Sequence, residues 1–366
     1  MRYVIIASGF FPRMGPRGLR TTELAKELSR QGHDVTVYAL LGSYDYQEYS
    51  KKTGVKVKQL GISKWGKKDS DGKSHANIIR KAIVRFCGKR FWLPDSDLIP
   101  MVRRAIGREK GVDCLITIAK PHVIHYAAAL SDLSEVRCWI ADCGDPFTLN
   151  PFANYPPRFV EYEKLWSEKC DYITVPIQEA IQGYYSEFHH KIRVIPQGFN
   201  FDDVRLATYM PHDMPTFAYV GAVYKGLRDP DAFLRNISKL EKDFRFIIYG
   251  NSWHHFLPYK EMLGEKLQFG GKLSHDDMLT AISSMDFLIN LNNNSGVQQP
   301  SKLIDYALSK RPFMSISSSF GEDEKYLFME FLHGDYSHQE TFEGLENYNI
   351  KTVAKKFTEL TQSKAL

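Results

Sequence analysis

Short apolar runs alternate with helical patterns along this chain. Residues 3–7 form a continuous apolar run, and a loop rich in glycine and proline follows it. Residues 20–31 then carry leucines on one helical face and end at Gly32, whose missing Cβ suits a left-handed helix cap. The next apolar run, residues 35–40, begins at once. This order of strand, loop, helix and strand predicts a βαβ unit and, with it, a parallel sheet.

The same alternation continues in two series, separated by the turn-forming residues 201–215. Further strands are predicted at residues 114–118, 136–141, 172–175, 193–196, 217–220, 244–249, 267–269, 287–291 and 313–316. We therefore predict an α/β protein of two tandem Rossmann-like, doubly wound domains, residues 1–205 and 206–349. Whether a final helix at about residues 350–366 packs back on the first domain is left open.

Length and composition agree with two folded domains. Of the 366 residues, 43% are hydrophobic and 25% are charged, which is the balance of a protein with buried cores. No stretch approaches the roughly 20 continuous apolar residues of a spanning helix, and the chain opens on a strand without a basic leader, so we expect a cytoplasmic protein. The five cysteines are odd in number and lack metal-type spacing, which predicts reduced core thiols.

The segment at residues 300–308 is the most informative one for chemistry. It follows a predicted strand, and Pro300 suits the first position of a helix, so the N–H groups of Ser301 and Lys302 would point out of the helix start. The helix dipole and the Lys302 ammonium both favour a diphosphate there. Asp305, one turn further on, is placed to accept hydrogen bonds from a ribose diol. An ordinary capped surface helix is the alternative.

This segment resembles the nucleotide-binding helix of the family-four GT-B retaining glycosyltransferases, especially their bacterial polysaccharide-biosynthesis subgroup. The resemblance covers nearly the whole chain, because further matching segments occur in the family's order around the loop of Gly15 and Gly18, and at residues 191–198, 219–221 and 228–230. It implies two domains facing each other across a cleft. The first would bind the acceptor, and the second would bind a nucleotide diphosphate sugar, with UDP preferred to GDP.

The resemblance also implies a reaction. A sugar would move with retention of configuration to a lipid-linked glycan, as in capsule or O-antigen biosynthesis, at the inner face of the cytoplasmic membrane. The leaving diphosphate would be stabilised by Ser301, Lys302 and Arg228 where negative charge develops. Retention without an evident nucleophile is usually assigned in such enzymes to front-face attack.

The chain departs from the family pattern at two glutamate positions and at one arginine position. Val297 stands at the first of two usual glutamates, while Asp305 stands at the second, so the first role passes to Gln298, Gln299 or backbone amides. A second departure concerns the usual arginine after the glycine of the first C-domain strand. Ala222 follows that glycine here.

The missing arginine leaves the positive charge beside Gly221 to another residue. Lys225 and Arg228 are the candidates, and the subgroup pattern favours Arg228. The resemblance further implies a wall beside the nucleotide base that is formed by Gly271 and Lys272.

The predicted first domain carries polar residues at the ends of two strands. Asp142 and Asp145 follow the strand at residues 136–141 and are placed to orient the acceptor hydroxyl or accept its proton, although Asp-Pro is also a common turn opening. Their segment resembles an Asp-x-Arg-Asp-Pro-Trp string of the same subgroup. His122 and His125 follow another strand, and the resemblance implies that they approach the sugar, whereas a lone helical histidine is more often structural.

Three Asp-x-Asp strings are candidates for a metal site. None directly follows an apolar strand, which indicates turns and helix caps, and we predict no metal and no cofactor beyond the nucleotide sugar. The strings begin at Asp69, Asp95 and Asp229.

The net charge of +5 is concentrated in one segment. Nine Lys or Arg residues lie between Lys64 and Pro94 against two aspartates. A helix there would place Ile79, Ala82, Ile83 and Phe86 on one face, and Lys81, Arg85 and Lys89 on another, with Trp92 after its end. This pattern predicts a membrane-surface helix with Trp92 at the membrane interface, while a core-packed helix with a solvated basic face is the alternative. A nucleic-acid partner fits this pattern less well and is not expected, because no recognised motif is present and the rest of the chain is slightly acidic.

Two other functions fit the same fold. A GT-B relative can act as a sugar-nucleotide epimerase, which needs catalytic acid and base groups around the donor sugar. A catalytically silent partner of another transferase also fits, and the missing glutamate and arginine favour that alternative.

Overall fold

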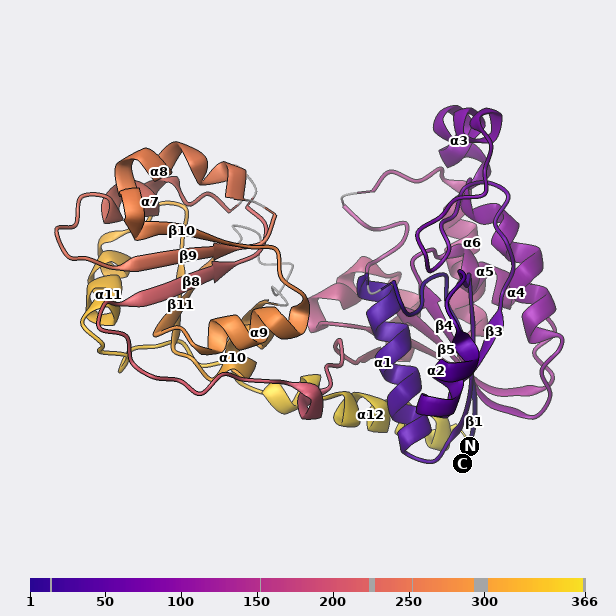
Figure 1. The fold of residues 1–366 in the computed structure, drawn as a ribbon. Coiled ribbons are helices and arrows are strands. Elements are labelled where there is room, and N and C mark those ends of the chain that lie inside the picture. Colours follow the sequence, from indigo (N-terminus) through magenta and orange to yellow (C-terminus); the bar gives the residue numbers. More distant parts are fainter. Residues whose placement is uncertain (14, 152, 224–227, 252, 293–301, 365–366) are drawn as a thin grey trace. The chain divides into compact units, whose positions relative to one another are not determined.

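The computed structural model describes residues 1–13, 15–151, 153–223, 228–251, 253–292 and 302–364. The chain divides into two compact units (Figure 1). The first unit comprises Met1–Asn200 together with Glu346–Leu366, and the second comprises Phe201–Leu345. The first unit therefore ends at Asn200, where the sequence pattern placed the boundary near residue 205.

The first unit is built on one parallel sheet of seven strands, in the order β3-β2-β1-β4-β5-β6-β7. The edge strand β3 has no counterpart among the predicted strands, because Val57 is its only apolar residue. Polar edge strands of this kind protect a sheet from pairing with other chains. The strands are β1 Arg2–Ile6, β2 Asp34–Ala39, β3 Lys56–Gln59, β4 Val112–Ala119, β5 Val136–Cys143, β6 Tyr172–Val175 and β7 Ile192–Val194.

Helices cover both faces of this sheet, and the alternation of side chains along β1 separates the two cores. Val4 and Ile6 pack with α4, α5 and α6, whereas Tyr3 and Ile5 pack with α1, α2 and α12. Helix α1 begins at Pro16, earlier than expected. The helices are α1 Pro16–Arg30, α2 Tyr46–Thr53, α3 Ile78–Phe91, α4 Leu98–Ile106, α5 Val123–Ala129, α6 Arg158–Lys169 and α12 Ile350–Ser363.

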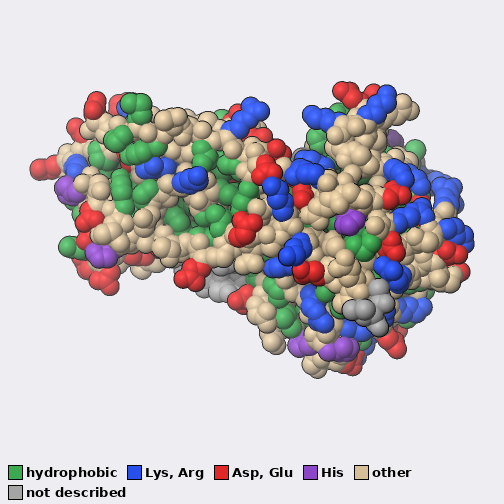
Figure 2. All heavy atoms as spheres, turned by 90° about the horizontal axis from the view of Figure 1, so that it is seen from below, with side chains coloured by type: hydrophobic (Ala, Val, Ile, Leu, Met, Phe, Trp, Pro, Cys, Tyr) green, Lys and Arg blue, Asp and Glu red, His purple; other side chains and the backbone are tan. Residues whose placement is uncertain are grey.

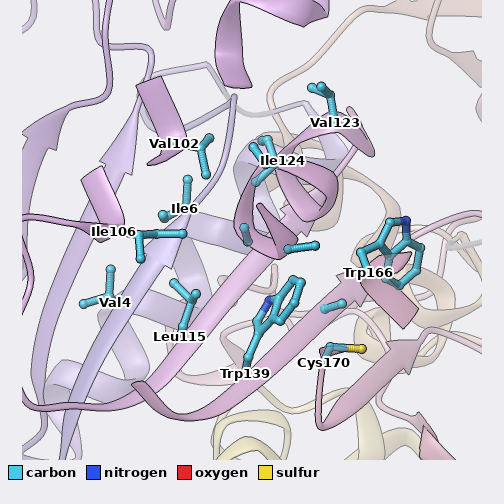
Figure 3. Packing of buried hydrophobic residues seen from close by; sticks show 14 of the residues in the cluster. Val4, Ile6, Val102, Ile106, Leu115, Val123, Ile124, Trp139, Trp166 and Cys170 are labelled. Carbon is cyan, nitrogen blue, oxygen red and sulfur yellow. The ribbon is translucent and has the colours of Figure 1, made fainter. Parts of the chain in front are cut away.

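The core on the α4–α6 face is shown in Figure 3. Leu115 of β4 and Trp139 of β5 lie in the same cluster as Val102 and Ile106 of α4. The indole Nε1 of the buried Trp139 donates to the Thr117 hydroxyl at 2.9 Å, so the large ring buries apolar surface without leaving its N–H group unpaired. The five cysteines are free thiols, and four of them are buried in this unit.

Helix α12 is the last element of the chain and completes the first unit. Four of its side chains enter the core on the α1 face, and the backbones of Phe199 and Ile350 join by a hydrogen bond of 2.8 Å. Gly198 permits this packing, since a Cβ there would lie 2.5 Å from the Ile350 side chain. The four core residues are Ile350, Val353, Ala354 and Phe357.

The second unit has a parallel sheet of five strands, in the order β10-β9-β8-β11-β12. Its core is rich in aromatic rings. Phe217 of β8 stacks on Phe246 and on Phe287, with ring centroids 4.7 Å and 4.6 Å apart. The strands are β8 Thr216–Val220, β9 Arg245–Tyr249, β10 Leu267–Gly271, β11 Phe287–Leu291 and β12 Phe313–Ile316. The helices are α7 Asp231–Ile237, α8 Leu257–Leu263, α9 His275–Ser283, α10 Lys302–Ser309 and α11 Glu322–Leu332.

The surfaces of the two units differ in character. On the face shown in Figure 2, Lys and Arg side chains are spread mainly over the first unit, whereas the second unit shows more hydrophobic surface. Among the described residues, no helix is both long enough and apolar enough to cross a membrane.

Candidate functional site

Helix α10 is held against the carboxyl ends of two strands by a buried tyrosine. The Tyr306 hydroxyl donates to the carbonyl oxygen of Ile289 in β11 at 2.9 Å and accepts from the amide of Val220 in β8 at 3.1 Å. Both hydrogen-bonding capacities of this buried hydroxyl are therefore used. The start of α10 is fixed at the edge of the sheet where ligands bind in folds of this type.

Lys302, the first residue of α10, lies over the end of β8. Its Nζ donates to the Tyr219 hydroxyl at 2.8 Å and sits 4.4 Å from the centroid of that ring. Gly221 makes room for it, because a Cβ at this position would lie 2.1 Å from Lys302 Cε, and its φ of 126° favours glycine. The ammonium and the glycine predicted from separate motifs are thus brought together.

Burial lowers the pKa of Lys302 to about 7, and the positive charge of Arg228 lowers it further in the same direction. The two predicted cations therefore lie close enough to repel each other. An anion bound between them would relieve that repulsion and restore the charge of Lys302.

Asp305 lies one turn further along α10 and is paired with a residue that the sequence pattern did not single out. Its carboxylate is 2.8 Å from Nε2 of His275, at the start of α9, and this hydrogen bond raises the pKa of His275. One carboxylate oxygen is therefore already engaged by the imidazole. His275 follows Ser274, which caps α9, and no motif marks it as functional.

The other residues predicted around the nucleotide fall in two groups. Gly271 ends β10 in a left-handed conformation, and Lys272 follows it as an exposed residue. The remaining four lie outside the described residues: Lys225, Gln298, Gln299 and Ser301.

In the first unit, Asp142 is the anion of a buried ion pair. Its two carboxylate oxygens accept from Arg20 at 2.8 and 3.1 Å, and the Thr174 hydroxyl adds a third hydrogen bond at 2.7 Å. Both charged side chains are about 97% buried. We therefore correct the prediction that Asp142 handles the acceptor hydroxyl, because both of its oxygens are engaged inside the core and shielded from solvent.

Arg20 joins several elements through its remaining donors. It donates to the carbonyl oxygens of Ile195, at 3.2 Å, and Pro196, and its guanidinium lies 5.2 Å from the ring centroid of Phe357 in α12. The pair of Arg20 and Asp142 thus connects α1, β5, the end of β7 and α12.

His125 is also structural. It is fully buried in α5, with Nδ1 2.7 Å from the Thr117 hydroxyl and Nε2 3.4 Å from the Cys143 sulfur. Burial lowers its pKa to about 3, so it stays neutral. The prediction that His125 approaches the sugar is therefore wrong, since both ring nitrogens are engaged inside the core.

His122 behaves differently. Its side chain is 3% exposed, and neither ring nitrogen has a hydrogen-bond partner among the described residues. Burial, with help from the positive charges of Lys120 and Arg17, holds its pKa well below the usual range. The ring stacks on Phe147 with centroids 4.4 Å apart, which fixes its plane.

Asp145, the second predicted carboxylate, remains accessible. It pairs with Lys120 at 3.1 Å, and both side chains are nearly half exposed. Because exposed pairs of this kind are weak, the carboxylate can exchange Lys120 for a ligand.

The loop before α1 contains the two predicted glycines. Gly18 has a packing role, because a Cβ there would lie 2.2 Å from the carbonyl oxygen of Arg13, while a Cβ on Gly15 would meet nothing within 4 Å. The same loop carries Arg17, whose guanidinium crosses Gly144 so closely that a Cβ there would lie 1.8 Å from it. Arg17 was not predicted, and its position at a helix start directly after a proline is the only signal.

A cavity of about 860 Å³ opens beside His122 in the first unit. Aromatic rings from two segments and four cationic side chains line it. The rings are Phe86, Trp92, Phe147, Tyr155 and Phe159, and the cations are Lys67, Arg85, Arg90 and Lys120.

Helix α3, the predicted membrane helix, stands away from the other helices of its unit (Figure 1). Ile78, Ile79 and Phe86 are 86%, 71% and 84% exposed, so the alternative of a core-packed helix is wrong. Lys81 and Arg85 are also exposed, and Lys89 lies in the same helix.

Trp92, which was predicted as an aromatic anchor at the membrane, is instead part of the fold. Its ring stacks on Tyr162 with centroids 5.4 Å apart and packs against Phe159 at 4.7 Å. Phe91, the preceding residue, is 57% exposed and takes the place of Trp92 on the surface.

The acidic strings serve as turns and caps within the described residues. Asp69 accepts from two backbone amides, Asp97 accepts from the amides of Lys64 and Trp65, and Asp229 accepts from the amide at the start of α7. One cluster of metal-type side chains occurs in this part of the chain, with ligand atoms within 4.8 Å of one another: His122, His125 and Cys143. Because the ring nitrogens of His125 are already bonded, we interpret this cluster as a core contact.

No family model and no curated protein matches this chain. Solved structures do match over its whole length. A glycosyltransferase from Rickettsia africae is 14% identical, with 100% of this chain and 98% of the other covered and a TM-score of 0.60. The lipopolysaccharide outer core galactosyltransferase WaaB is 12% identical, with both chains covered completely and a TM-score of 0.58.

A third neighbour is the E. coli trehalose-6-phosphate protein bound with UDP-2-fluoro glucose. It is 10% identical and covers 99% of each chain with a TM-score of 0.65. Structural similarity over the whole length at such low sequence identity shows a shared fold and nothing more specific. The chain therefore has the α/β GT-B fold of these glycosyltransferases, with two parallel sheets flanked by helices.

Proposed function

We propose that this chain is a retaining glycosyltransferase that moves a sugar from a nucleotide diphosphate, UDP in preference to GDP, to a lipid-linked glycan in the synthesis of a surface polysaccharide. The observation that carries the proposal is the partly buried Lys302 at the start of α10, beside Gly221 and close to Arg228. The fold shared with glycosyltransferases supports it, as does the UDP sugar bound by one of those neighbours.

The second unit binds the donor in this proposal. Lys302 and Arg228 meet the diphosphate, and Gly221 lets it approach the backbone at the end of β8. Asp305, oriented by His275, has its second oxygen for a ribose hydroxyl. The roles of Ser301, Lys225, Gln298 and Gln299 follow from the family resemblance alone.

The chemical step requires stabilisation of the leaving diphosphate. As the bond between the sugar and the diphosphate breaks, negative charge grows on the oxygen that leaves, and Lys302 and Arg228 offer fixed positive charge to it. The desolvated surroundings of Lys302 strengthen this interaction. The first unit supplies Asp145 as the accessible carboxylate for the acceptor hydroxyl, in place of Asp142.

Purified protein should release UDP from a UDP-sugar only when an acceptor is present, and excess EDTA should leave turnover unchanged, because cationic side chains meet the diphosphate. Calorimetry with UDP and GDP, followed by a nucleotide-release assay with and without EDTA, measures this. Loss of turnover on chelation, restored by magnesium or manganese, would contradict metal independence. Isomerisation of the donor sugar in the absence of an acceptor would indicate an epimerase. Nucleotide binding without turnover in the presence of an acceptor would indicate a catalytically silent partner.

The membrane part of the proposal is supported by α3. Its exposed apolar side chains lie on the same helix as exposed Lys81 and Arg85, which is the composition of a helix at the surface of an anionic bilayer. We place the protein at the cytoplasmic face of that membrane, where its lipid-linked acceptor lies. The galactosyltransferase WaaB, a protein of lipopolysaccharide synthesis, is consistent with this setting.

Changing Lys81, Arg85 and Lys89 together to glutamate should abolish co-sedimentation with anionic liposomes at low salt. Each cation near such a surface contributes on the order of 1 kcal/mol, so loss of three weakens binding roughly a hundredfold or more before repulsion is counted. Binding of the wild type should also fall with increasing salt.

The matched control changes three exposed arginines of the same unit to glutamate, at the end of α4 and just beyond it: Arg103, Arg104 and Arg108. This control alters net charge equally but leaves α3 intact, and it should retain most of the binding. Equal loss in both triple variants, or a wild type that ignores the liposomes, would show that α3 is not a membrane helix.

A further inference from the structure

The cavity beside His122 lies entirely within the first unit and is assembled from separate segments. Its lining includes the three residues that follow β4, the second half of α3 with the turn after it, and Phe147, Tyr155 and Phe159. Its volume of about 860 Å³ lies within the range of small-molecule sites, roughly 300–1,000 Å³.

One wall of this cavity is a set of packed aromatic rings. Phe147 stacks on His122, lies parallel to Trp92 at 5.7 Å between centroids, and meets the edge of Tyr155 at 4.8 Å. Because each ring is held by its neighbours, the wall is formed before any ligand arrives. Flat, preorganised aromatic surfaces suit the apolar face of a sugar ring.

His122 supplies a polar group at this wall. A neutral imidazole carries one N–H donor and one acceptor nitrogen, and at His122 both are unpaired among the described residues although the side chain is 3% exposed. A buried polar atom left unpaired costs about 1–3 kcal/mol, so a ligand that bonds to it gains accordingly. A sugar hydroxyl, which both donates and accepts, matches these two nitrogens.

The cavity lining also contains cationic side chains. Lys67 pairs with Asp95 at 3.0 Å and Lys120 pairs with Asp145, but neither Arg85 nor Arg90 has an ion-pair partner in the part of the chain that the structure describes. Two guanidinium groups without carboxylates favour an anion with several oxygens, since each planar fork can bind two of them. A phosphate that joins a sugar to a lipid carries one negative charge and offers two non-bridging oxygens to such forks.

Phe86 connects the cavity to the outer surface of α3. It lines the cavity and is also 84% exposed, on the helix that carries Ile79 and Ile83. An apolar chain attached to a phosphate at Arg85 and Arg90 would therefore leave the cavity along exposed apolar side chains.

From these features we infer that the cavity binds the sugar phosphate part of the acceptor, with the sugar against Phe147 and His122, the phosphate at Arg85 and Arg90, and its lipid along α3. This inference rests on the proposed transferase function and names the chemical class of its acceptor. It requires no residue of the second unit.

The test uses α-D-glucose 1-phosphate as the probe, with the protein first saturated with UDP so that the donor site is filled. Quenching of tryptophan fluorescence, to which Trp92 in the cavity wall contributes, reports binding. The wild type should bind this probe at least tenfold more tightly than methyl α-glucoside. The double variant Arg85→Gln and Arg90→Gln should lose at least tenfold in affinity for the phosphate, and His122→Phe should weaken both probes.

The control variant is Arg103→Gln with Arg104→Gln, two exposed arginines on α4 that are remote from the cavity lining, and it should bind like the wild type. Equal losses in both double variants would overturn the inference. Glucuronic acid bound as tightly as glucose 1-phosphate would overturn the phosphate assignment in favour of an acidic sugar. If UDP binds but neither probe does, the cavity is not the acceptor site, while the proposed transferase function stands. If a probe binds but UDP does not, the proposed transferase function is refuted.

Discussion

Replacing Asp142 with asparagine is expected to lower the free energy of unfolding by about 3–5 kcal/mol, because the buried Arg20 guanidinium would lose its counterion. Asparagine has nearly the same shape, so the loss would come from charge and hydrogen bonding instead of from a cavity. Arg20→Met should destabilise the protein similarly, since it leaves the Asp142 carboxylate buried without its partner.

Urea unfolding followed by tryptophan fluorescence measures this loss of stability, because the signal comes mainly from the first unit, which contains the ion pair. Four of the five tryptophans belong to the first unit, namely Trp65, Trp92, Trp139 and Trp166. The control is Asp34→Asn, which removes an exposed partner of Lys56 and should change stability by less than about 1 kcal/mol. Equal midpoints for Asp142→Asn and the control would show that the buried pair does not hold α1 on the sheet.

The same pair gives stability a defined dependence on pH. Burial alone would raise the pKa of Asp142, but the Arg20 charge and hydrogen bonds outweigh burial and leave the pKa below its usual 3.8. Because the folded pKa is below the unfolded one, the contribution is complete above about pH 4 and is lost as the pH falls below that value. Asp142→Asn should therefore differ most from the wild type near neutral pH and least in acid.

The second large effect concerns Lys302. Binding of UDP to the wild type is expected to weaken by roughly tenfold or more between pH 7 and pH 9, because the pKa of Lys302 is about 7 in the free protein and rises when a diphosphate binds. UDP binding is therefore coupled to the uptake of a proton by Lys302. As the pH rises, a smaller fraction of the protein molecules carries a charged Lys302. Lys302→Met should weaken binding at pH 7 by roughly 10–100-fold and should flatten this pH dependence.

Calorimetry in two buffers of different ionisation enthalpy detects the proton uptake directly. The control is Lys325→Met on α11, a partly exposed lysine paired with Glu322 in the same unit, which should keep both affinity and pH dependence. A wild type with constant affinity from pH 7 to pH 9, or a Lys302→Met variant with unchanged affinity, would remove Lys302 from the diphosphate site.

The predicted strands correspond closely to those of the structure where an apolar run is bounded by turn formers. The strand over residues 287–291 appears as β11 with the same bounds. Strand β3 is not evident in the sequence, because it lies at the sheet edge and alternates lysine with a single valine. An edge strand needs apolar residues only on the side that meets the core. In a strand as short as β3, the resulting alternation of polar and apolar residues is too brief to recognise.

The candidate site was predictable only in part, and for a physical reason. Lys302, Gly221 and Asp305 stand in motifs whose spacing fixes their place at strand and helix ends. Other predicted residues also lie at strand or helix ends, namely Asp142, His125 and Trp92. These are buried or paired by residues from distant segments of the chain. Sequence patterns do not show that Arg20 crosses 122 positions to reach Asp142.

Helix α12 has a consequence for the order in which the protein forms during synthesis. The face of the first sheet that carries Tyr3 and Ile5 buries Val353 and Phe357, and these residues emerge from the ribosome only after residues 201–345 have been made. The second unit is continuous in sequence and can fold as soon as it is complete. The unit that begins first therefore finishes last, and until then its uncovered face is the part of the nascent chain most in need of protection from aggregation.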